Sequence, residues 1–195
     1  MNRPPTYFLA VEVTSSVRRA LSPLLEEMTG MGAGIRPVRA DGLHLTLRYL
    51  GRIDPAQKVA VRAAAAEIAG AGRPFIVAFS GPELAPPGSS PQVVWAPLGA
   101  GEVDLAAIGT RLNLALADKG WAPPSQPFRA HCTLARLSSH LSRGVSSHLD
   151  ELCARSYGEP SLQMPVESLS LMESVPVVGQ ASSYRRRGQW ALGGG

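Results

Sequence analysis

Hydrophobic positions at the start of the chain change from the period of a strand to that of a helix. The run Tyr7 to Val13 is apolar except for Glu12, and its β-branched and aromatic content predicts a central strand. Apolar residues then recur every three or four positions, which predicts a helix that ends near Gly30. The stripe of this helix is Val17, Leu21, Leu24 and Met28.

Three further helices are expected from capping residues and from apolar spacing. Asp54, Pro55 and Gln57 give one helix an acidic cap, a proline at its first position and an amide three residues after the cap. The next helix is expected to end near Gly120. The three apolar stripes are Val61, Ala65 and Ile68, then Leu105, Ile108, Leu112 and Ala115, and finally Val145, Leu149 and Leu152.

Short apolar or alternating runs between these helices predict additional strands. These runs are Ile35 to Val38, Pro74 to Ser80, Gln92 to Pro97, Leu162 to Val166, and Leu169 to Leu171. Gly81 to Pro91 is rich in Pro, Gly and Ser and predicts a loop. The arginines at 185–187 are interpreted as a solvated basic turn, and the closing glycines are expected to be frayed.

This order of elements predicts an α+β protein with two pseudo-symmetric lobes. The strands are expected to form mainly antiparallel sheet, with helices on the outer faces and a cleft between the lobes. A length of 195 residues fits one domain over residues 1–195. With 45% hydrophobic and 17% charged residues, the composition excludes a disordered chain.

Charge, cysteines and hydropathy narrow the class of protein only slightly. A formal net charge of +4 is compatible with an anionic partner such as RNA. Cys132 and Cys153 form no metal-binding pattern and are expected to be reduced. The first apolar run is short and carries Glu12, so we expect no signal peptide, no membrane partner and a cytoplasmic location.

The pattern His-x-Thr-Leu occurs twice, at His44 in HLTLRYLG and at His131 in HCTLARL. In a strand, side chains two positions apart share a face, so each histidine shares a face with a threonine, Thr46 or Thr133. The intervening residues would face an apolar core. Each strand therefore presents one imidazole and one hydroxyl to the same space.

Two other interpretations compete with a catalytic one. A single histidine in a strand is more often a satisfied structural residue, although the repetition of the pattern weakens that interpretation here. A zinc site needs three or four grouped donors, and neither motif supplies a carboxylate at a matching position. His140 and His148 have no ligand spacing and are expected to be solvated. We therefore expect no metal.

Paired imidazoles suit acid–base catalysis near neutral pH, because one ring can be neutral while the other is protonated. The threonine hydroxyls would donate to the non-bridging oxygens of a phosphate and stabilise the charge that develops during displacement. The residues alone thus favour phosphoryl transfer or phosphodiester hydrolysis that needs no metal.

The two motifs resemble those of the two-histidine (2H) phosphoesterase superfamily, and in particular its RNA 2′,3′-cyclic phosphodiesterase branch, historically called 2′-5′ RNA ligases. The flanking segments YFLAVEV, PQVVWAPLG and SLSLMES, with Tyr184 and Trp190, are also similar to this branch, so that the likeness spans nearly the whole chain. The resemblance implies two α+β lobes that each contribute one motif strand to a central cleft.

The resemblance also implies roles for individual residues. The reaction opens a 2′,3′-cyclic phosphate to a 2′-phosphate without a cofactor, with His131 as base, His44 as acid, and Thr46 and Thr133 on the non-bridging oxygens. Arg136 matches a position associated with substrate contact, but strict alternation points it away from His131 unless the strand bulges near Ala135.

Two weaker candidates for substrate binding come from the same strands. Arg48 lies on the His44 face by strict alternation and could reach a phosphate, although a surface ion pair is equally compatible with its position. Phe8 matches an aromatic position of the family and could stack on a terminal base, although it could equally belong to the core. Tyr49 departs from the phenylalanine common in the family.

The expected partners are RNA or nucleotide ends that carry a cyclic phosphate, acted on by a monomer. Relatives with the same motifs act on cyclic ADP-ribose derivatives, 2′-5′ oligonucleotides or other phosphodiesters, so the resemblance leaves the substrate open. A module that binds phosphorylated RNA ends without turnover is the alternative. Two intact histidines argue against it, because Arg or Lys stays charged at every physiological pH and would serve pure binding better.

Overall fold

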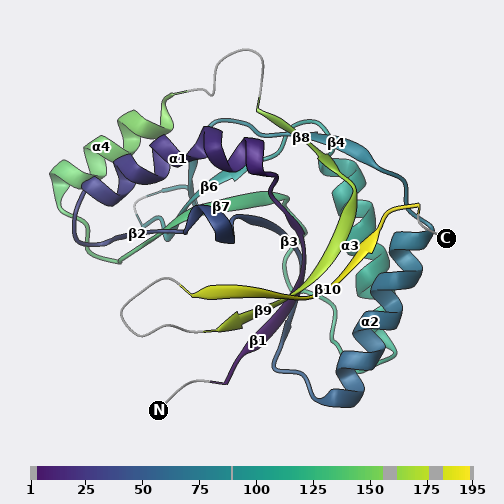
Figure 1. Cartoon of the computed structure of the whole chain (residues 1–195). Coiled ribbons are helices and arrows are strands. Elements are labelled where there is room, and N and C mark those ends of the chain that lie inside the picture. Colours follow the sequence, from purple (N-terminus) through teal and green to yellow (C-terminus); the bar gives the residue numbers. More distant parts are fainter. Residues whose placement is uncertain (1–3, 89, 156–161, 176–181, 194–195) are drawn as a thin grey trace.

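The computed structural model describes residues 4–88, 90–155, 162–175 and 182–193, and it has the α+β architecture predicted from the sequence (Figure 1). Its helices are α1 (Ser15–Gly30), α2 (Pro55–Gly70), α3 (Glu102–Ala117) and α4 (Arg143–Cys153), with a short 3-10 helix at Ala40–Gly42. Its strands are β1 (Thr6–Glu12), β2 (Ile35–Pro37), β3 (His44–Gly51), β4 (Phe75–Ala78), β5 (Glu83–Ala85), β6 (Val93–Pro97), β7 (His131–Leu137), β8 (Gln163–Val166), β9 (Ser168–Val175) and β10 (Ser183–Ala191).

The two motif strands, β3 and β7, lie side by side at the centre of one antiparallel sheet. The sheet order is β10-β9-β1-β3-β7-β6-β5, with β2 also paired to β7, and a second small sheet pairs β4 with β8. The order is symmetric about the β3–β7 contact, because β1 flanks β3 as β6 flanks β7. The two predicted lobes therefore share one continuous sheet.

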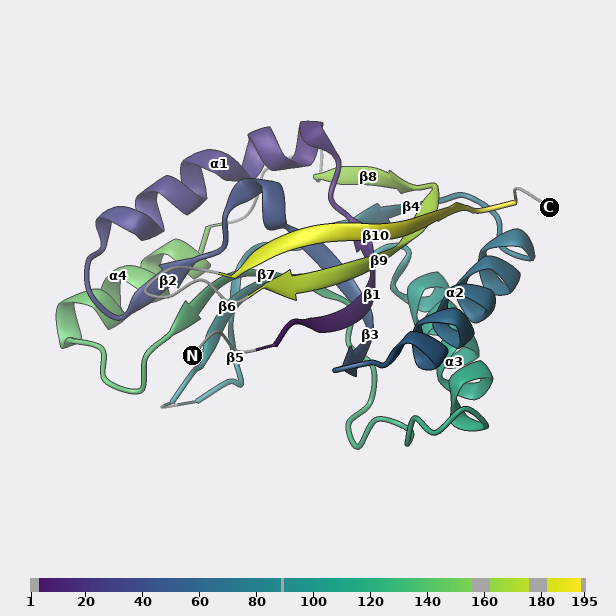
Figure 2. The same ribbon diagram turned by 60° about the horizontal axis from the view of Figure 1, so that its bottom comes forward.

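Helices cover the apolar face of this sheet and cross between the lobes. The helix α1 follows β1 but packs on β2 and β7, whereas α3 follows β6 but packs on β3 and α2. Figures 1 and 2 show α1 beside α4 at one end of the molecule and α2 beside α3 at the other. This exchange buries one core behind both motif strands. No helix among the described residues is long and apolar enough to cross a bilayer.

The predicted helix start at Asp54 is confirmed in detail. The Asp54 carboxylate accepts from the backbone N–H of Gln57 at 2.7 Å, and the Gln57 side-chain oxygen accepts from the Asp54 N–H at 3.0 Å. Two of the predicted apolar stripes are wrong at one position each, since Leu25 and Leu116 are buried where Leu24 and Ala115 were expected. The helical period itself is correct in both cases.

Two strands were not predicted. The expected loop at 81–91 contains β5, which pairs with β6. The tail forms β10, an edge strand whose register with β9 shifts between Arg186 and Gly188, and this bulge hides the period of a strand. The glycines expected to be frayed fall mostly outside the described residues at 194–195, whereas the Gly193 N–H donates to the Ala69 carbonyl.

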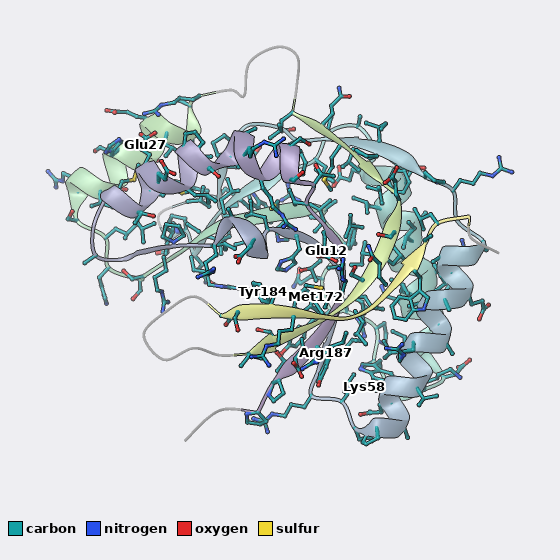
Figure 3. The ribbon with its side chains drawn as sticks, in the orientation of Figure 1. Glu12, Glu27, Lys58, Met172, Tyr184 and Arg187 are labelled. Atoms are coloured by element: carbon teal, nitrogen blue, oxygen red, sulfur yellow. The ribbon has the colours of Figure 1, made fainter. Side chains whose placement is uncertain are left out.

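A buried carboxylate ties β10 to β1 and α2. Glu173 on β9 accepts from the Tyr7 hydroxyl at 2.6 Å and from both Nε and Nη2 of Arg187, at 3.0 and 2.6 Å. Lys58 on α2 donates to the same hydroxyl at 3.2 Å. Figure 3 shows Lys58 and Arg187 on the opposite side of β9 and β10 from Tyr184. These bonds, that of Tyr7 first, hold the pKa of Glu173 below its usual 4.5.

Replacing this carboxylate should destabilise the protein. Glu173→Gln is expected to lower the free energy of unfolding by about 1.5–3 kcal/mol at neutral pH, because a buried charge-assisted network loses its acceptor. Since the folded pKa of Glu173 is lowered, the difference from the wild type should shrink as the pH falls below 4.5. Urea unfolding at several pH values measures both effects, with the exposed Glu67→Gln on α2 as control. Equal stability of the two variants would contradict this role.

Candidate active site

The two His-x-Thr motifs meet at a single backbone pair, Leu45 opposite Cys132. Both of these side chains are buried in the core, so their neighbours along each strand point to the other face. Antiparallel geometry around this pair places His44 beside Thr133 and His131 beside Thr46. Two imidazoles and two hydroxyls therefore share one face, as the period of each strand alone predicted.

Each histidine ring is held in the same way by the backbone two residues before it. The Nδ1 of His44 lies 2.7 Å from the Gly42 carbonyl oxygen, and the Nδ1 of His131 lies 2.8 Å from that of Arg129. A carbonyl oxygen only accepts, so Nδ1 carries a proton and donates in both rings. The Nε2 atom of each neutral ring is left with its lone pair, as a proton acceptor for chemistry on this face.

Aromatic side chains fix the planes of both rings. His44 packs against Phe8 and Tyr184, with ring centroids 4.6 and 5.0 Å apart. His131 packs against Trp95 at 4.4 Å, and the guanidinium of Arg129 covers Trp95. Both imidazoles are partly buried, which limits their rotation while leaving one edge open.

Phe8 is a core residue, which is the second of the two interpretations that its sequence position allowed. Its side chain is only 4% exposed, and it forms a small apolar cluster with Ala10 and Met172 beneath His44. A ring with so little free surface offers no face to a substrate base. Figure 3 shows Met172 and Tyr184 together near Glu12, and the Tyr184 ring packs against His44. Phe8 thus supports the His44 ring.

Burial lowers the pKa of both histidines below the usual 6.5. For His44, the bond to Gly42 and the charge of Glu12 oppose this effect, while repulsion from His131 and Arg136 adds to it. For His131, the bond to the Arg129 carbonyl opposes the effect and the Arg129 charge adds to it. The two rings therefore differ in electrostatics, since a carboxylate favours the charged form of His44 only.

A bulge at the same place in each motif reverses the alternation of side chains. Ala10 pairs with Thr46 and Leu9 with Arg48, so Leu47 is an extra residue in β3. In β7 an equivalent register shift leaves Leu134 as the extra residue. Residues that follow each bulge therefore lie on the opposite face from the one that simple alternation gives.

The bulges place Arg48 and Arg136 on opposite faces. The expectation that Arg48 shares the His44 face is wrong, because its side chain is 9% exposed and donates to the Ala122 carbonyl on the core side. Arg136 is exposed on the histidine face, and the bulge that this position requires is present. Tyr49, at the equivalent position of the first motif, is 60% exposed.

A pocket of about 320 Å³ is lined by Tyr184, whose ring packs against His44. Its walls come from β1, β2, β3, β7, β9 and β10, from the residue after β2 and from the residue before β10. Its lining residues are Thr6, Arg36, Val38, Tyr49, Arg136, Ser174, Ser182 and Tyr184. The space combines two aromatic rings, two guanidinium groups and several hydroxyls, which suits a nucleotide.

Several residues that surround the two histidines were not identified from the sequence as part of the candidate site. Trp95 and Tyr184 were part of the resemblance, but no pattern linked them to the histidines. Gly42 lies so close to Tyr184 that a Cβ atom would meet the ring at 2.9 Å, and its carbonyl orients His44. Glu12 was noted only as a break in an apolar run, although it pairs with His44 on the adjacent strand.

The remaining candidates for metal ligands lie apart. His148 on α4 contacts Glu27 at 3.2 Å, and His140 lines a different pocket. Among the residues that the structure describes, no group of three His, Cys, Asp or Glu side chains is placed to hold a metal. Cys132 and Cys153 are both free, and burial raises their pKa values to about 12 and about 11.

Comparisons with known proteins agree with this geometry. A model of the 2′-5′ RNA ligase superfamily matches residues 17–176. A protein of Archaeoglobus fulgidus named RNA 2′,3′-cyclic phosphodiesterase is 28% identical over 169 residues, which are 86% of this chain and 90% of that protein. Crystal structures of a Thermus thermophilus protein and of Escherichia coli LigT complexed with 3′-AMP match 97% of this chain. Their TM-scores are 0.79 and 0.71, their identities 24% and 25%, and the match covers 98% and 99% of their chains.

The tautomer of the two motif histidines can be measured directly. We expect long-range ¹H–¹⁵N spectra of the neutral protein to show a protonated Nδ1 in both His44 and His131, because each donates to a backbone carbonyl. The exposed ring of His140 serves as the internal reference. A protonated Nε2 in either motif histidine at neutral pH would contradict the arrangement described above.

Proposed function

The chain belongs to the 2′-5′ RNA ligase superfamily, and on this basis we propose that it hydrolyses RNA or nucleotide 2′,3′-cyclic phosphates to 2′-phosphates by acid–base catalysis with two histidines. The observation that carries the proposal is the pair of imidazoles on one face, each with Nδ1 bound to a carbonyl and with Nε2 bonded to none of the residues that the structure describes. The name of the A. fulgidus relative supports the same substrate class.

In the proposed reaction, His131 acts as the base and His44 as the acid. The Nε2 atom of His131 takes a proton from water, whose oxygen attacks phosphorus. The bond between phosphorus and the 3′ oxygen breaks, and Nε2–H of His44 protonates that oxygen. The product carries a 2′-phosphate, and the two rings return to their starting states by proton exchange with solvent.

The surroundings of the two rings support this direction. Glu12 of β1 pairs with His44 of β3 and favours its protonated form against the opposing charges of His131 and Arg136. No carboxylate acts in this way on His131, where the positive charge of Arg129 favours the neutral ring. The carbonyl bonds suit both roles, because Nδ1 stays protonated in an acid and in a base alike. No step of the reaction assigned to these side chains requires a metal.

The threonines are proposed to stabilise the charge on phosphorus oxygens. Thr133 lies beside His44, and Thr46 lies beside His131, so a phosphate between the rings has one hydroxyl near each side. Their donation to the two non-bridging oxygens would strengthen as negative charge develops there. Removal of such a donor typically costs about 10²–10³ in kcat.

Loss of either histidine should abolish most of the activity. We expect His44→Ala and His131→Ala each to lower kcat by about 10²–10⁴ on a short RNA with a 2′,3′-cyclic phosphate end. The double variant should be little worse than either single one, because the rings act as a unit. Assays of released product measure this, with His148→Ala as the control far from the motif strands.

Identification of the product separates the proposal from its alternatives. A terminal 2′-phosphate is expected, whereas a 3′-phosphate would reverse the leaving oxygen and contradict the proposed direction of attack. Tight binding that survives both alanine substitutions, without turnover by the wild-type protein, would instead indicate a module that binds phosphorylated RNA ends.

The dependence of kcat/KM on pH should be bell-shaped and acid-shifted. The base must be neutral and the acid protonated, and both pKa values lie below the usual 6.5 in the free protein. The maximum is therefore expected below pH 6.5, with unchanged rates in EDTA. Glu12→Gln removes the charge that favours protonated His44 and should move the alkaline limb to lower pH. A rate that climbs steadily through pH 8, or that EDTA abolishes, would refute this mechanism.

A further inference from the structure

Two arginines face each other across the β2–β7 pair, beside the proposed active site. Arg36 and Arg136 are direct partners in the register, and both side chains are exposed. In the part of the chain that the structure describes, neither forms an ion pair with a carboxylate. Like charges directly opposite each other destabilise a sheet. An anion between the two guanidinium groups would remove this repulsion.

These arginines form the boundary between two pockets. Both line the pocket of about 320 Å³ that reaches Tyr49 and Tyr184, and both line a second pocket of about 640 Å³. The second pocket is walled chiefly by polar side chains, which include Ser90, Gln92, Ser138, Ser139, His140 and Ser146. No aspartate or glutamate is among the described residues that line either pocket. Two neighbouring pockets that share two arginines and have no acidic residue in their described lining therefore suit an extended anion.

The spacing from the catalytic strands matches one nucleotide. Arg136 lies three positions after Thr133, which corresponds to at most about 10 Å of strand. The Arg136 charge also depresses the pKa of His44, so the guanidinium lies within electrostatic reach of that ring. A phosphate between the arginines would thus lie one nucleoside away from a phosphate between the histidines, with the first pocket between them.

We propose that the Arg36–Arg136 pair binds the phosphodiester that precedes the terminal nucleotide of the substrate. The terminal nucleoside then occupies the smaller pocket, and the preceding nucleoside occupies the larger one. This inference rests on the proposed function and names its substrate class as RNA of two or more nucleotides. Guanidinium groups suit the task because each can bind phosphate oxygens through two parallel hydrogen bonds.

The test compares two substrates that differ only in this phosphodiester. One is a mononucleoside 2′,3′-cyclic phosphate, and the other is a dinucleotide with the same terminal nucleoside 2′,3′-cyclic phosphate. The wild-type protein should have a kcat/KM at least tenfold higher for the dinucleotide. Arg36→Gln should lower this ratio at least tenfold, mainly through KM for the dinucleotide. The dependence of log KM on log salt should also fall by about 0.7 in slope, as expected for one lost phosphate contact.

Arg111→Gln on α3 is the matched control, since it removes the same charge outside both pockets and should keep the wild-type ratio. Because Arg36→Gln removes a repulsion, its melting temperature should equal or exceed that of the wild type, which excludes misfolding as the cause of a lowered ratio. An unchanged ratio in Arg36→Gln, or a wild-type protein without preference for the dinucleotide, would overturn the inference. Failure to hydrolyse either substrate would instead contradict the proposed function.

Discussion

The contact between β3 and β7 at Leu45 and Cys132 is the constraint on which the proposed chemistry depends. These side chains are buried in the core, and their burial fixes which face the motif histidines occupy. Bonds from Nδ1 to backbone carbonyls then set the rotation and the tautomer of each ring. The geometry of the site is therefore supplied by the two strands, by the packed apolar layer behind them and by the backbone just before each strand.

The bulge shared by both motifs turns a symmetric pair of strands into an asymmetric site. In each strand, the first residue after the extra leucine points toward the core, and the second residue after it points toward the histidine face. This second residue is Tyr49 in β3 and Arg136 in β7. A ring and a cation at equivalent positions distinguish the two sides of an otherwise repeated arrangement, and Glu12 beside His44 adds a second difference.

Local periodicity was sufficient to predict the fold class and the shared face of the two His–Thr pairs, because both follow from spacing within single elements. The faces of the residues that follow Leu47 and Leu134 could not be predicted from alternation alone. A bulge reverses them, and a bulge depends on pairing with a neighbouring strand. Arg48 was misplaced for this reason. Phe8 and Arg36 acquire their roles only from neighbours distant in sequence, namely His44 and Arg136. The edge strand β10 was missed because three arginines and a bulge obscure its alternation.

The central claim is that one phosphate binds between the Nε2 atoms of both motif histidines. It is tested most directly by an NMR titration of the two imidazoles with a nucleoside 2′-monophosphate, the type of product expected from the reaction. The phosphate charge should raise the pKa of His44 and of His131 together, with the same dissociation constant, while the ring resonances of His148, on α4 outside both pockets, stay unchanged. A response from only one motif histidine, or different affinities for the two, would contradict the account.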